Sequence, residues 1–135
     1  MRTLLFLLLA LTVLTYSGCD DEEMVDPDCV QARWLGDYRG TATCNGTENP
    51  ATISVSAIGL ERIRIEYVQE EPGGGSSRTT YDPILLNGCE LDQTSSGGGI
   101  TSSVRATLAG DELVIREELT TSSSSFICDI RGTRD

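Results

Sequence analysis

The fold is decided by residues 51–67, which read ATISVSAIGLERIRIEY. Apolar and polar side chains alternate on both sides of Ile58-Gly59, and a period of two is typical of strands with one buried face. Glycine adopts the positive φ angles that tight hairpin turns require. The stretch therefore predicts two antiparallel strands, 51–57 and 62–67, joined by a tight turn.

The same alternation recurs along the rest of the chain after the first 33 residues, where we find no helical period. The predicted strands are 38–44, 51–57, 62–67, 84–86, 89–91, 102–108, 113–119 and 126–131. Eight short strands at this spacing are typical of a β-sandwich or a β-barrel.

The connections between the strands favour the barrel. Tight turns are predicted at Ile58-Gly59, Asn87-Gly88 and Gly110-Asp111, and long polar loops at 45–50, 70–80, 93–99 and 120–125. In an up-and-down meander alternate connections lie at opposite ends, so the tight turns would gather at one end and the loops at the other. The sequence therefore predicts an all-β fold, an eight-stranded antiparallel up-and-down barrel, preceded by a helical signal peptide.

The cysteines add a test of this barrel. Closure places the first strand beside the last, and Cys44 and Cys128 then share a face at the loop end, at a spacing that suits a disulfide. Cys29 and Cys89 both fall at the tight-turn end. Of the three connectivities of four cysteines we expect Cys44–Cys128 and Cys29–Cys89.

Residues 1–18 have the order of a secretory signal. Arg2 is followed by the uncharged apolar run 4–16, and small residues precede Cys19. The run is shorter than the roughly 20 apolar residues that span a bilayer. Tyr16-Ser17-Gly18-Cys19 resembles the lipobox of bacterial lipoproteins, although the motif usually has Leu at the position of Tyr16.

This resemblance implies cleavage before Cys19 and fatty acyl chains, palmitate among them, on that cysteine. The lipid would attach the protein to a membrane; secretion without lipid is the alternative. With Cys19 modified, four of the five cysteines remain for disulfides in an oxidising compartment.

Residues 19–33 form a predicted acidic tether, and residues 34–135 the barrel domain. The run of carboxylates at 20–23 stays solvated. In some bacterial lipoproteins such acidic residues direct export to the cell surface, whereas in others an Asp directly after the cysteine retains the protein at the inner membrane. We expect the bacterial cell envelope, with the outer membrane or cell surface favoured over the inner membrane.

Composition excludes several functions. The formal net charge is −11 and all ten basic residues are arginine, so nucleic acid is not an expected partner. The chain has no histidine and no C-x-x-C pair, so we expect no His-dependent nucleophile, no zinc site and no cofactor. Glu117 and Glu118 are neighbours on a strand and face opposite ways. We therefore expect no enzyme.

The domain resembles the small lipocalin-like barrels of bacterial lipoproteins. Lipocalins begin with G-x-W and often pack a late Arg against that Trp. Here Gly36-Asp37-Tyr38 stands in its place, with Trp34 displaced, and Arg131 in the closing segment 128–131 is the candidate late Arg. The resemblance implies a barrel able to hold one small ligand, although we favour a core filled by side chains.

We therefore expect a membrane-anchored, non-catalytic binding or interaction module of the envelope. It would take a small apolar ligand or a protein partner at its long loops, near Arg78, Tyr81 and Ser96. The alternatives are an inhibitor of a secreted enzyme such as lysozyme, and a structural envelope protein. Because the tether enters at the tight-turn end, the loop end would point away from the membrane.

Overall fold

The computed structural model describes residues 30–85 and 87–135. The predicted signal peptide, Cys19, Cys29 and most of the acidic tether lie outside the described residues. Within those two ranges no helix is long and apolar enough to cross a membrane.

One short helix and eight strands form the described part. The helix is α2 (Gln31–Trp34), and the strands are β1 (Gly36–Cys44), β2 (Thr47–Ala57), β3 (Arg62–Glu70), β4 (Ser76–Leu85), β5 (Glu90–Gly97), β6 (Ile100–Ala109), β7 (Glu112–Thr121) and β8 (Ser125–Arg134).

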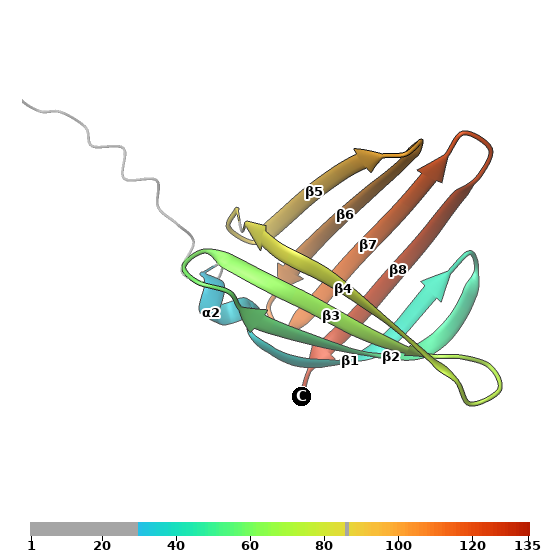
Figure 1. Cartoon of the computed structure of the whole chain (residues 1–135). Helices are drawn as coiled ribbons and strands as arrows, with labels where there is room; N and C mark the ends of the chain where they lie inside the picture. Colours follow the sequence, from blue (N-terminus) through green and yellow to red (C-terminus); the bar gives the residue numbers. More distant parts are fainter. Residues whose placement is uncertain (1–29, 86) are drawn as a thin grey trace, which may run out of the picture.

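The strands form one antiparallel sheet in the order β4-β3-β2-β1-β8-β7-β6-β5, which confirms the predicted meander and the pairing of the first strand with the last. The sheet curls into a half-barrel, with β4 and β5 as its two edge strands (Figure 1). Because these two strands are not paired in the described residues, a seam stays open between them.

The predicted long loops are wrong, because the strands extend into them. Residues 76–80 belong to β4, 93–97 to β5, 120–121 to β7, and 47–50 to β2. The turns between strands are short at both ends of the half-barrel; Asn45-Gly46 and Gly98-Gly99 suffice for two of them. Serine and threonine dominate these added segments. Such residues adopt a strand conformation when their backbone forms hydrogen bonds with a neighbouring strand.

The core lies on the concave face of the sheet. The alternation predicted from the sequence is confirmed: Ile53, Ile65, Leu113, Ile115 and Ile130 are almost fully buried. Small residues in the same rows, such as Ala42 and Ala106, let the two walls of the curl approach. The α2 end of the half-barrel is therefore filled by side chains.

α2 closes one end of the core. Trp34 is completely buried and its indole Nε1 donates a hydrogen bond to the Gly88 carbonyl at 3.1 Å. Gln31 donates from Nε2 to the carbonyls of Gly59 and Arg62 at 2.9 and 2.8 Å. α2 thus packs against the strands, and the chain enters at the end where the β2–β3 turn lies (Figure 1).

The arginine that packs against Tyr38 is Arg134, not Arg131, the candidate expected from the resemblance. The Arg134 guanidinium lies over the Tyr38 ring, 5.3 Å from its centroid, and donates to the Tyr38 hydroxyl at 2.9 Å and to the Arg33 carbonyl. Arg131 is exposed, because it alternates with the buried Ile130. Sequence reasoning chose the wrong arginine because it ended the last strand too early.

The predicted Cys44–Cys128 disulfide is confirmed. The two cysteines are directly opposite each other in the β1–β8 register, with Cα atoms 4.0 Å apart. Cys89 is also disulfide-bonded; its predicted partner, Cys29, lies outside the described residues.

Candidate binding site on the concave face

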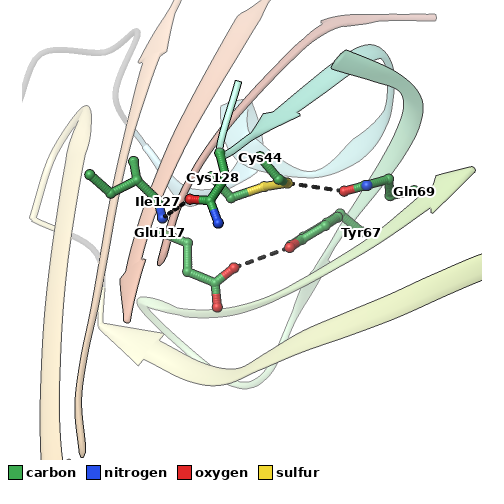
Figure 2. The surroundings of a disulfide bond; sticks show 7 residues. Cys44, Tyr67, Gln69, Glu117, Ile127 and Cys128 are labelled. Atoms are coloured by element: carbon green, nitrogen blue, oxygen red, sulfur yellow. Dashed lines mark hydrogen bonds between the residues drawn. A yellow bond between two sulfur atoms is a disulfide. The ribbon is translucent and has the colours of Figure 1, made fainter. Parts of the chain in front are cut away.

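A carboxylate reaches across the inside of the half-barrel toward a tyrosine. The Tyr67 hydroxyl of β3 donates to Glu117 of β7 at 3.1 Å (Figure 2). In the sheet order β2, β1 and β8 separate these two strands, so the bond spans the concavity. Glu117 points inward because it alternates in phase with Leu113 and Ile115.

A second tyrosine completes the group. Tyr81 of β4 is 9% exposed, and its ring centroid lies 6.1 Å from that of Tyr67. Burial, together with the nearby Glu117 and Tyr67, raises the pKa of Tyr81 far above its usual range. Its hydroxyl lies next to Glu117 and the Tyr67 hydroxyl, although no hydrogen bond of good geometry joins it to either. The phenol is therefore held protonated beside these two groups.

A bulge in β4 positions Tyr81. The β3–β4 register shifts between Ile63 and Ile65, whose partners are Ile84 and Tyr81. The bulge adds a residue, so that both Tyr81 and Ile84 are buried although strict alternation would place them on opposite faces. Asp82, inside the bulge, is anchored on the outer face by Arg64 at 3.0 Å.

The Cys44–Cys128 disulfide forms the floor beside this group. Cys128 pairs in register with Glu117, and Cys44 Sγ lies 3.2 Å from the Gln69 side-chain amide (Figure 2). A disulfide sulfur carries no hydrogen, so a hydrogen bond here requires the NH2 group of Gln69 to donate. The covalent link fixes β1 against β8 and with it the strand register around Glu117.

The structure separates the three predicted binding residues. Only Tyr81 faces the concave side. Arg78 lies on the outer face of β4 and pairs with Glu66 at 3.2 Å, while Ser96 of β5 shares a hydrogen bond of 3.1 Å with Thr101 of β6. Arg78 and Ser96, expected in loops, and Tyr81, expected next to one, all lie within strands.

Sequence reasoning missed Tyr67 and Glu117 as members of one site. The alternation in 51–67 puts Tyr67 on the same face as Ile63 and Ile65, and Glu117 and Glu118 are predicted to face opposite ways. The available signal was a charge at an inward position of the alternating segment 113–119. A carboxylate on a buried face is costly without hydrogen-bond partners, so such a position is a candidate for function.

The concave face opens to solvent toward the seam. Every residue of β5 after Leu91 is exposed, including Gln93 and Ser95, which share a face with the buried Leu91. Depressions of about 280 and 300 Å³ lie elsewhere, on the outer faces of β1–β3 and β5–β6. The solvent-exposed part of the concave face is thus polar along β5, whereas the buried core at the α2 end is apolar.

Chemically, the group offers one carboxylate and two neutral phenols. Burial raises the pKa of Tyr67 as well, so both phenols remain hydrogen-bond donors at neutral pH. In the part of the chain that the structure describes, no three His, Cys, Asp or Glu side chains gather to hold a metal ion. The arrangement suits hydrogen bonding and charge recognition.

No protein-family model and no curated protein sequence matches the chain. Among solved structures, a redesigned β-barrel is similar, with a TM-score of 0.54 and 13% sequence identity. The match covers 76% of this chain and 91% of the designed one. At this identity the likeness shows a β-barrel fold and nothing further.

Proposed function

We propose that the protein is an exported, lipid-anchored lipoprotein whose half-barrel is a non-catalytic binding module for a small molecule. The observation that carries the binding role is the open seam between β4 and β5, beside which the half-buried Glu117 carboxylate lies with Tyr67 and Tyr81. A carboxylate on an inward face is costly unless its hydrogen-bonding positions are filled, so this group is a candidate to hold a ligand or a water.

The anchoring part of the proposal is supported by the sequence. Residues 1–18 have the order of an export signal, and Cys19 follows small residues as in a lipobox. The chain enters the folded domain at the α2 end, whereas the Tyr67–Glu117 pair lies toward the opposite end, near the Cys44–Cys128 link. The binding face would then be held away from the membrane surface.

The location proposed is the bacterial cell envelope, on the outer membrane or cell surface. The net charge of −11 opposes contact with anionic headgroups and nucleic acid, so membrane attachment would rest on the lipid alone. A carbon chain buried in the bilayer contributes about 0.8 kcal/mol per CH2 group, which makes several acyl chains an effective anchor.

Native mass spectrometry of the full chain, extracted from the membranes of its host in a non-ionic detergent, tests the proposal. We expect the mass of a chain that begins at an acylated Cys19, with a second, heavier species that loses a small molecule on collisional activation. An unmodified mature mass would contradict the anchor. A bare mass under the gentlest conditions, with a co-purified protein that binds the seam, would contradict the small-molecule role.

A further inference from the structure

In the described part of the chain, Glu117 forms no ion pair with an arginine. Inward positions of the described strands hold two charged side chains, Glu117 and Arg134, and Arg134 lies at the other end against Tyr38 and Asp111. The other described ion pairs join arginines to carboxylates on the outer face, such as Arg116 with Asp129 at 3.1 Å. Among the described residues, no arginine forms an ion pair with Glu117.

One hydrogen bond does not satisfy a carboxylate. Glu117 accepts from Tyr67, but an ionised carboxylate has about four acceptor positions. It is half-buried, so solvent satisfies the remaining positions only in part. A partly desolvated negative charge of this kind attracts a positive group more strongly than an exposed one does.

The surroundings of Glu117 are suited to an organic cation. Tyr67 meets the carboxylate through its hydroxyl, and its ring lies 6.1 Å from that of Tyr81; aromatic faces attract ammonium groups through their quadrupole. The Tyr81 hydroxyl lies next to Glu117 and Tyr67, and its oxygen can accept a hydrogen bond from an N–H group. Three groups from β3, β4 and β7 thus converge on one position.

Apolar side chains lie next to this group, toward the turns β5–β6 and β7–β8. Leu119 and Phe126 pair directly across β7 and β8, and Ile100 begins β6. Phe126 is 36% exposed and Ile100 is 45% exposed, although both occupy inward positions. Large apolar residues at the solvent-facing end of a concave face offer contact to a hydrocarbon chain.

We propose that the concave face binds an amphipathic organic cation, with its ammonium group at Glu117, Tyr67 and Tyr81 and its short hydrocarbon chain against Leu119, Phe126 and Ile100. This rests on the proposed binding function and names its ligand class. It replaces the purely apolar ligand expected from the sequence, since that expectation placed no charge inside the barrel.

Calorimetry on the full chain in a non-ionic detergent, with n-butylammonium, n-butanol and butyrate as probes, tests the ligand class. We expect butylammonium to bind most tightly and butyrate not to bind. Glu117→Gln should weaken butylammonium binding by at least about tenfold, the loss expected for one charged hydrogen bond. Tyr81→Phe, which keeps the ring, should weaken it by a smaller factor.

Glu118→Gln is the matched control, because Glu118 is the next residue on β7 and faces the outer side. It removes the same charge from the protein and should leave binding unchanged. If Glu117→Gln fails to fold, the order of the three probes on the unsubstituted protein decides. Shifts of the Tyr67 and Tyr81 ring signals in NMR spectra would then locate the bound probe.

The outcomes separate the ligand class from the binding function. Equal or tighter binding of butanol or butyrate on the concave face would overturn the cation and leave a small-molecule module. Equal losses in Glu117→Gln and Glu118→Gln would overturn the site by reducing it to overall charge. If none of the probes binds, the inference is overturned. A water on the Tyr81 hydroxyl in a crystal structure would then show that Tyr67, Tyr81 and Glu117 only link the strands.

Discussion

Gly40 and Gly132 lie directly opposite each other where β1 pairs with β8. A Cβ atom on Gly40 would lie 1.9 Å from the Arg131 carbonyl oxygen, and one on Gly132 would lie 3.0 Å from Tyr38 Cβ. The two strands therefore approach more closely here than any side chain would permit. The contact lies four residues along each strand from the Cys44–Cys128 pair.

Gly40→Ala should destabilise the fold by more than about 3 kcal/mol, since the added methyl meets backbone that cannot move independently of the sheet. Gly97→Ala in β5 is the control, because a Cβ there meets nothing within 4 Å; it should change stability by less than about 0.5 kcal/mol. Urea unfolding followed by circular dichroism measures both. Equal midpoints for the two variants would contradict the close approach.

Arg134→Lys should be destabilising, whereas Arg131→Lys should be neutral. Lysine keeps the charge of Arg134 but loses the planar group that lies over Tyr38 and bonds its hydroxyl and the Arg33 carbonyl. We expect a loss of about 1–3 kcal/mol, from a partly desolvated cation–π contact and its hydrogen bonds. An equal loss of stability in Arg131→Lys would contradict the assignment of this contact to Arg134.

Much of the fold could be predicted from alternation alone. The segment 51–67 contains the β2–β3 hairpin, and its inward residues Ile53, Ile65 and Tyr67 are buried as expected. The strand ends could not be predicted, because segments such as Ser76–Thr80 carry small polar side chains that fit strand and loop equally well. Their state depends on backbone pairing with a neighbouring strand, which a local pattern does not contain.

The candidate site was harder to predict, because it depends on contacts across the curl. Tyr67 and Glu117 are 50 positions apart and meet only once β3 and β7 face each other. Tyr81 was singled out, but its inward position results from the β4 bulge, which breaks the alternation. The open seam between β4 and β5 likewise reflects the final curvature of the sheet.

Removal of the Cys44–Cys128 disulfide should cost up to roughly 4–5 kcal/mol, because the bridge closes a loop with a sequence separation of 84. The loss should be smaller if the unfolded chain stays compact or is restrained by the disulfide of Cys89. The double variant Cys44→Ala/Cys128→Ala, compared by urea unfolding with the unsubstituted protein, measures it. Unchanged stability would mean that β1 and β8 hold their register without the link.

Cys19→Ala should abolish both the lipid and the membrane attachment. We expect the unprocessed precursor mass and a loss of the protein from lipid-modified, detergent-extractable fractions. Tyr16→Leu, which restores the usual lipobox residue, is the matched control and should be processed at least as fully. Mass spectrometry of membrane and soluble fractions decides; a Cys19→Ala chain with normal cleavage and acylation would rule out this anchor.

Stability should fall above about pH 10, where phenols of the unfolded chain ionise. Burial raises the pKa of Tyr38, Tyr67 and Tyr81 in the folded protein. The folded state then binds more protons than the unfolded state, so the free energy of unfolding decreases as pH rises. Each such phenol contributes up to about 1.4 kcal/mol per pH unit above its unfolded pKa.

Urea unfolding between pH 8 and 11 measures how steeply the free energy of unfolding falls with pH, with phenolate absorbance followed in parallel. Tyr67→Phe and Tyr81→Phe should each make this slope shallower. Phenolate absorbance that appears at pH 10 with no loss of stability would show that these hydroxyls are open to solvent. The Tyr81 hydroxyl beside Glu117 would then give no support to a ligand site.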